Sequence, residues 1–173
     1  MENKEIYKNA PEYCHYYFDL IETDDLLLEL EKSKALTMNT FKLITPELEN
    51  YSYEPGKWST KEVIQHIIDG ERVFSYRAFR FSRFDKTKLT GFEQTDYQKH
   101  MNSVELKLAD LQEDYLAVRN STISLFRNMT EKMLDFKGSA NDQIFTPRTL
   151  GFSMVGHNLH HCNFIKEKYL KIE

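Results

Sequence analysis

The chain has 173 residues, of which 40% are hydrophobic and 13% aromatic, and its formal net charge is −4. This length is sufficient to bury a core and the composition is not that of a disordered chain, so we expect a single domain spanning residues 1–173. The acidic balance gives no general attraction to nucleic acid, and no apolar run approaches the ~20 residues needed to cross a bilayer. We therefore predict neither a nucleic-acid nor a membrane partner.

The ends and the cysteines give a prediction about location. The first residues, Met1–Glu5, lack the charged-then-apolar pattern of a secretory signal. The two cysteines, Cys14 and Cys162, have neither a CxxC nor a finger-like spacing. The sequence predicts a cytoplasmic protein with two reduced thiols.

Only six glycines and four prolines interrupt the chain, and the long intervals between them are rich in residues that favour helices. A first helix is predicted over Tyr13–Ile44, where apolar residues recur at steps of three and four. The next segment, Thr45–Lys57, contains Pro46, Pro55 and Gly56 and is predicted to be a loop.

The second predicted helix has a clear start. Ser59 and Glu62 form an S-x-x-E capping box, and the apolar pattern continues to about Phe81. Trp58, just before the cap, is placed to pack back onto the helix as a staple. Gly70 costs a helix about 1 kcal/mol relative to alanine, and close approach of another helix or a ligand would explain its presence.

Two further helices complete the pattern. After a polar connection over Arg83–Asn102, a strongly amphipathic helix is predicted over Ser103–Thr130. A loop follows over Lys137–Gln143. The pair Thr146–Pro147 then has the pattern of an N-cap followed by a first-turn proline, and begins a helix that runs to about Leu170. Four amphipathic helices with polar connections predict an all-α four-helix bundle.

The candidate functional residues are histidines. His157 and His161 are four residues apart, so they project from the same face of the last helix, and His66 lies midway along the second. Three histidines from two helices can hold a transition metal and leave one coordination position open, as in catalytic sites. His160 is an alternative to His161, and hydrogen-bonded core histidines are the alternative to a metal site.

Charged residues near His66 extend this hypothesis. Asp69 or Glu62 could orient a histidine or accept a proton. The segment Arg72–Lys88 carries six cationic residues against one acidic residue. Such a cluster could attract an anionic thiol or carboxylate substrate, or it could be a solvated helix end where the helix dipole favours cations. Arg77, on the same stripe as His66, is the best candidate for a functional role.

Four segments, read together and in order, resemble the DinB superfamily in its YfiT-like branch. The resemblance extends from about Tyr16 to Leu170 and combines W-S-x-x-E, a mid-helix histidine and a late HxxxHH. The segments that carry it are Tyr53–Ser59, Ile64–Arg72, Gly91–Glu93 and Gly156–His161.

The resemblance implies a four-helix bundle with a divalent metal, zinc or nickel, held by His66, His157 and His161. It also implies a small-molecule substrate and a homodimer. Some members transfer low-molecular-weight thiols such as bacillithiol, mycothiol or glutathione, and others were described as metal-dependent hydrolases.

Our leading expectation is metal-dependent transfer of a thiol to an electrophile, in which the metal lowers the pKa of the thiol. Asp69 or Glu71 would assist proton transfer, beside Arg77. Hydrolysis is the alternative chemistry, and a non-catalytic binding or dimerisation module is the alternative of another class.

Overall fold

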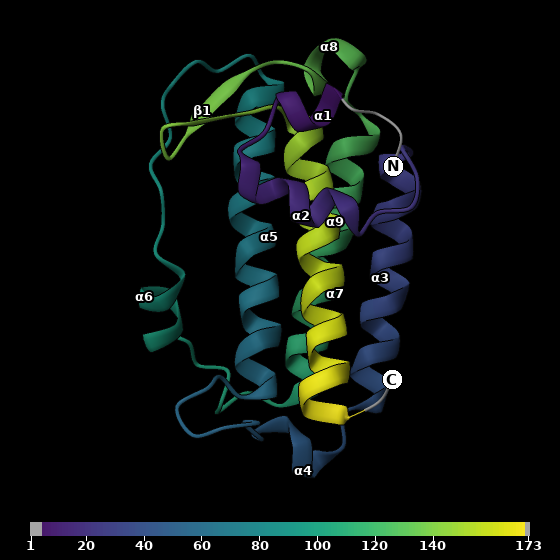
Figure 1. Ribbon diagram of the computed structural model, residues 1–173, viewed down its shortest axis with the longest axis vertical. Coiled ribbons are helices and arrows are strands. Elements are labelled where there is room, and N and C mark those ends of the chain that lie inside the picture. The colour runs from purple at the N-terminus through teal and green to yellow at the C-terminus, as the bar shows by residue number, and fades with distance from the viewer. Residues whose placement is uncertain (1–4, 172–173) are drawn as a thin grey trace.

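The computed structural model describes residues 5–171, and four long helices dominate this part of the chain (Figure 1). They run side by side along the long axis of the molecule, as the predicted bundle requires. The four helices are α3 (Leu26–Leu43), α5 (Thr60–Ser82), α7 (Leu108–Arg127) and α9 (Pro147–Phe164), the last continued by the π-helical segment η2 (Ile165–Leu170).

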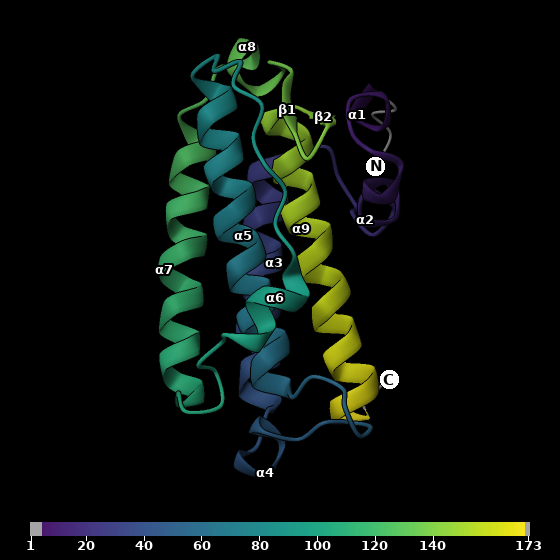
Figure 2. The same cartoon turned by 90° about the vertical axis from the view of Figure 1, so that its left-hand side faces the viewer.

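The connections determine which helices are neighbours. Helix α9 packs against α5 and α3, and α7 packs against the same two helices. Helices α5 and α7 point in the same direction, so the chain between them returns along the outside of the bundle, carrying α6 (Gln94–Lys99) past α5 (Figure 2). This long crossover covers one side of α5 and forms the outer wall of a cavity described below.

The capping signals in the sequence begin the two helices that carry the histidines. Ser59 and Glu62 form the predicted capping box, with the Ser59 amide donating to the Glu62 carboxylate at 2.7 Å. At the start of α9, the Thr146 hydroxyl accepts from the Thr149 amide at 3.1 Å, and Pro147 occupies the first turn. Both helix starts are confirmed.

The single first helix predicted over Tyr13–Ile44 is wrong. The chain instead forms α1 (Glu5–Lys8), η1 (Glu12–Cys14) and α2 (His15–Asp19), and only then α3. The break has a local cause, because the Asp25 carboxylate accepts from the Leu28 amide at 3.0 Å and caps a new helix.

Three other boundaries differ from the prediction. The loop predicted before α5 contains the short helix α4 (Pro46–Glu49), and the third helix is shorter at both ends than predicted, with α8 (Glu131–Leu134) after it. The loop predicted over 137–143 is largely a hairpin of β1 (Gly138–Ala140) and β2 (Gln143–Phe145). Asn141 and Asp142 both have positive φ, at 51° and 55°, which is the turn geometry that closes two-residue hairpins.

The interior has an apolar cluster at each end of the bundle and a polar layer between them. One cluster includes Phe18, Leu30, Phe81, Phe126, Leu150 and Phe152. The other includes Phe41, Ile64, Ile68, Leu111, Tyr115 and Tyr169. Each long helix contributes a buried polar side chain to the intervening layer, namely Thr37 on α3, Glu71 on α5, Arg119 on α7 and Asn158 on α9.

The short helix α2 crosses α9 (Figure 1), and its Tyr17 ring contacts the ring of the predicted metal ligand His157. Gly156 permits this contact, because a Cβ at that position would lie 2.3 Å from the backbone oxygen of Tyr17. The N-terminal segment is therefore in direct contact with the histidine-bearing part of the bundle. Within residues 5–171, no helix has the length and apolar character needed to cross a membrane.

Candidate metal centre

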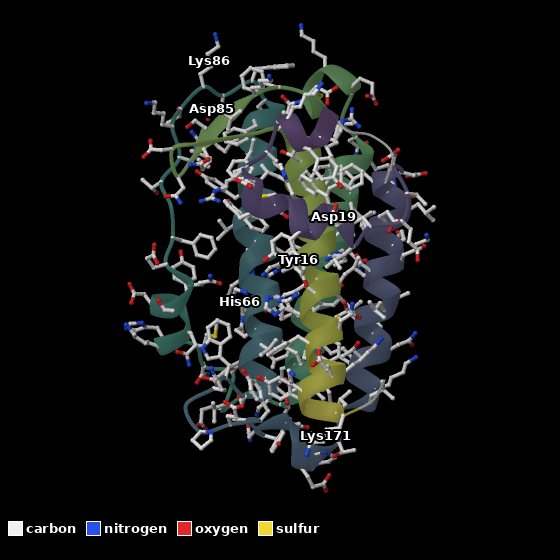
Figure 3. All side chains as sticks on the ribbon, in the orientation of Figure 1. Tyr16, Asp19, His66, Asp85, Lys86 and Lys171 are labelled. Carbon is white, nitrogen blue, oxygen red and sulfur yellow. The ribbon has the colours of Figure 1, made fainter. Side chains whose placement is uncertain are left out.

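The three predicted histidines converge in the middle of the bundle. His66 comes from α5, and His157 and His161 come from successive turns of α9. His157 Nε2 lies 2.9 Å from His66 Nε2 and 3.1 Å from His161 Nε2, and all three ligand atoms lie within 4.8 Å of one another. Figure 3 shows His66 on α5, near the middle of the long axis of the molecule.

This arrangement suits a metal ion better than a set of hydrogen bonds. A neutral ring nitrogen carries either one proton or one lone pair, so His157 Nε2 cannot satisfy both neighbouring nitrogens. Two nitrogens bound tetrahedrally to one zinc ion would lie about 3.3 Å apart, close to the two observed separations. The donor set therefore fits a divalent transition metal, and three imidazoles fill three of the four positions of a tetrahedral ion.

The buried setting keeps the imidazoles neutral, which is the state that binds metal. Burial lowers the pKa of His66 to about 4 and that of His161 to about 3, with further lowering by neighbouring histidines. Burial and repulsion from the other histidines hold the pKa of His157 well below its ordinary value. In the absence of metal, the three rings thus resist protonation in the folded protein.

These shifts predict that the metal-free protein loses stability on acidification. His66 titrates near its ordinary pKa of 6.5 in the unfolded chain and at about 4 in the folded chain. The unfolded state therefore binds the extra proton first, and stability falls as the pH drops from 6.5 towards 4. The shift corresponds to about 3 kcal/mol from His66 alone. Urea denaturation of chelator-treated protein across this range measures the effect.

The matched variant for this measurement is His66→Gln, which keeps a polar side chain without a titrating ring. Its free energy of unfolding should fall less steeply between pH 6.5 and 4 than that of the wild type. Equal slopes for the two proteins would contradict the pKa assigned to His66.

Aromatic rings and a glycine enclose the histidines. The Trp58 ring lies 5.1 Å from the His66 ring, and the Tyr17 and Phe74 rings lie 5.7 and 6.2 Å from the His157 ring, measured between centroids. A Cβ at Gly70 would lie 3.3 Å from His157 Cε1, which is tight. Gly70 thus allows the close approach of α9 that the sequence suggested. The apolar enclosure lowers the local dielectric around a bound cation.

The structure separates His160 from the other three. The His160 ring is only half-buried, and its Nδ1 hydrogen-bonds with the Tyr16 hydroxyl at 3.0 Å. The converging group consists of His66, His157 and His161. The structure thus favours His161 over His160 as the third ligand. Among the described residues, the buried His161 Nδ1 has no hydrogen-bond partner, whereas metal-bound histidines usually donate this proton.

Asp69 and Arg77 line a cavity of about 620 Å³ between α5 and the crossover segment. We call it the cationic cavity, because Arg72, Arg77 and Lys88 line it together with Phe92. Arg77 is buried, donates to the Thr90 carbonyl at 3.0 Å, and lies over the Phe92 ring. Asp69 accepts from the Gln65 amide at 2.9 Å, and burial raises its pKa. Both are therefore placed to meet a bound molecule.

Glu71, which the sequence analysis proposed for proton transfer, forms a buried ion pair with Arg119. The one N–H of Arg119 Nε is shared between both oxygens of the Glu71 carboxylate, at 2.8 and 3.0 Å, and Arg119 Nη2 donates to one of them at 2.7 Å. Both side chains are buried. Arg119 also donates to the Leu30 carbonyl, to Ser33 and to Asn158. The proton-transfer role of Glu71 stays a prediction, and these contacts favour a structural role in the polar layer. Glu62 is likewise occupied, by Ser59 and by Gln98.

Sequence analysis missed Arg119, although one signal was present. Arg119 follows Leu111 and Tyr115 at four-residue steps on the apolar stripe of α7, and all three side chains are buried. A cation on an apolar stripe indicates a buried anionic partner. The sequence does not identify that partner, because it lies 48 residues away on another helix.

A bundle of long helices in which three histidines from two helices converge defines a helical-bundle protein with a candidate metal centre. A family model for the DinB superfamily matches residues 29–165, so the chain belongs to the DinB superfamily. This confirms the predicted family.

A solved structure, described as "YfiT from Bacillus subtilis is a probable metal-dependent hydrolase with an unusual four-helix bundle topology", is similar over 86% of each chain. The TM-score is 0.73 and the sequence identity 16%, so the likeness establishes the shared fold. Comparison with curated protein sequences finds no match.

Proposed function

We propose that this protein is a metal-dependent enzyme that transfers a low-molecular-weight thiol to an electrophilic small molecule. The observation that carries the proposal is the convergence of three neutral imidazole nitrogens, from His66, His157 and His161, with no carboxylate in the group. A divalent ion held there would act as a Lewis acid that lowers the pKa of a thiol or water in its open position. Zinc and nickel both suit this donor set.

The cationic cavity supports a thiol that carries a negative charge. Arg72, Arg77 and Lys88 line it, so it would favour the carboxylate of a charged thiol over a neutral one. Arg77 is held by Thr90 and Phe92 and is therefore oriented before a ligand arrives. Asp69 lines the same cavity one turn beyond His66, and its raised pKa suits a group that accepts and releases a proton.

In this reaction a carbon–sulfur bond forms and the bond from that carbon to its leaving group breaks. The thiol proton passes to Asp69 or to solvent, and the leaving group departs with the bonding electrons. Hydrolysis at the same centre is the second candidate, and the description of YfiT as a probable metal-dependent hydrolase supports it. A homodimer and a cytoplasmic location remain predictions.

The test is to identify which nucleophile enters the product. Zinc- or nickel-loaded protein is incubated with 1-chloro-2,4-dinitrobenzene and a charged thiol, either glutathione or bacillithiol, in ¹⁸O-labelled water. We expect the thioether by mass spectrometry, without ¹⁸O in the product. Arg77→Met should raise the KM for the charged thiol about tenfold, because it removes one charge-assisted contact. Arg148→Met removes an arginine that instead pairs with Glu131 and Asp135, and serves as the matched control.

The outcomes separate the alternatives. An ¹⁸O-labelled phenol with no thiol consumed would establish hydrolysis in place of transfer. If no electrophile reacts, and His66→Ala lowers stability without changing metal content, the histidines support the fold and the binding-module hypothesis replaces the enzyme.

A further inference from the structure

A second, smaller cavity of about 250 Å³ lies where the loop before α5 meets the end of α9, and His161 itself lines it. We call it the aromatic cavity. It is formed by the loop before α5 and the end of α9, and its aromatic walls are Tyr53, Trp58, Phe164 and Tyr169. No function described above uses it.

The walls of the aromatic cavity are held in place before any ligand binds. The Tyr53 ring stands edge-to-face against Phe164 and Tyr169, with centroids 5.6 and 5.3 Å apart. The Tyr169 hydroxyl donates to the Trp58 carbonyl at 2.7 Å, which ties the loop to the end of the bundle. Because these side chains are already ordered, binding a ligand in the cavity costs little conformational entropy.

Trp58 connects the aromatic cavity to the metal centre. Its ring lines the cavity and lies 5.1 Å from the His66 ring. His161 likewise belongs to both places, since it lines the cavity and its Nε2 lies 3.1 Å from His157 Nε2. A group bound in the aromatic cavity would thus lie against His161, with the Trp58 ring between it and His66.

The chemistry of the walls selects an uncharged ligand. Four aromatic rings and Val63 offer apolar contacts and edge-to-face stacking for another ring. An aromatic cage can also bind a cation. Here Lys57 is in the wall and none of the described lining residues is acidic. A metal ion at the adjoining histidines would repel a second cation as well. The volume accommodates a small ring with a few substituent atoms, below the range of drug-sized pockets.

We infer that the aromatic cavity binds the apolar, preferably aromatic, portion of the electrophilic substrate. This inference rests on the proposed function and adds a substrate class to it. The two cavities then bind different substrates. The cationic cavity binds the charged thiol, and the aromatic cavity binds the uncharged acceptor beside His161.

The test measures binding without turnover, using 4-fluorobenzyl alcohol, which is neutral and has no good leaving group. Fluorine NMR follows the probe, and Trp58, the single tryptophan of the chain, reports the location through its emission. We expect saturable binding accompanied by a change in Trp58 fluorescence. Phe164→Ala should weaken binding about tenfold, since it removes one stacking wall. Phe92→Ala, the same substitution in the cationic cavity, should leave probe affinity unchanged.

A second measurement uses the wild type alone, so that it does not depend on the folding of a variant. The (4-fluorobenzyl)trimethylammonium ion has the same ring with a positive charge, and we expect it to bind at least about tenfold more weakly. Tighter binding of the cation would overturn the inference, as would the absence of saturable binding or a loss of affinity in Phe92→Ala alone. Probe binding with no thiol transfer would uphold the cavity and refute the proposed function.

Discussion

Replacing His157 with alanine should abolish stable metal binding. His157 is the central residue of the candidate metal centre, with its Nε2 2.9 Å from that of His66 and 3.1 Å from that of His161. Structural zinc sites gain about 10–16 kcal/mol from four ligands, so the loss of one ligand should weaken affinity by at least about a hundredfold. Elemental mass spectrometry of the purified protein measures the metal content, and competition with a chelator measures the affinity.

The adjacent histidines provide the control. His160→Ala should retain about one equivalent of metal, because its Nδ1 pairs with Tyr16 outside the converging group. His161→Ala should lose it. The reverse pattern would assign the third ligand to His160, and a wild type that cannot be loaded with zinc or nickel would contradict the metal centre as a whole.

The site could be predicted from the sequence because its signals are local. A capping box at Ser59 fixes the start of α5, and Thr146–Pro147 fixes the start of α9, so the helical faces of the histidines follow from residue spacing. The four-residue step between His157 and His161 then places both rings on one line. The packing of α5 against α9 cannot be predicted from local signals alone. It follows from the bundle, which the four amphipathic helices predict.

The features that the sequence did not reveal depend on contacts between distant segments. The aromatic cavity is lined by the loop around Trp58 and by Phe164, and neither segment alone predicts a cavity. The hairpin at Asn141 has strands of three residues, too short for a period-two pattern to be recognised. Charged residues on amphipathic helices are usually solvated, so Glu71 gave no sign of its buried partner.

The ion pair between Glu71 and Arg119 gives the second large prediction. Arg119→Met should lower the free energy of unfolding by about 3–5 kcal/mol, because it leaves a buried carboxylate without its counter-charge. Arg119 is fully buried, and although burial opposes its charge, Glu71 raises the arginine's pKa above its ordinary value. The same substitution at Arg72, whose ion pair with Asp114 is half exposed, should cost less than about 1 kcal/mol. Urea denaturation of the metal-free proteins measures both.

A double variant identifies the cause. In a Glu71→Gln background the side chain at position 71 carries no charge, so Arg119→Met no longer leaves a buried carboxylate without its counter-charge. The loss in the free energy of unfolding caused by Arg119→Met should therefore be smaller in that background than in the wild type. An equal loss in both backgrounds would mean that lost packing, rather than the unpaired Glu71 carboxylate, destabilises the variant. Because Asn158 contacts Arg119 and directly follows His157, the variant's metal affinity also tests whether the polar layer positions the metal centre.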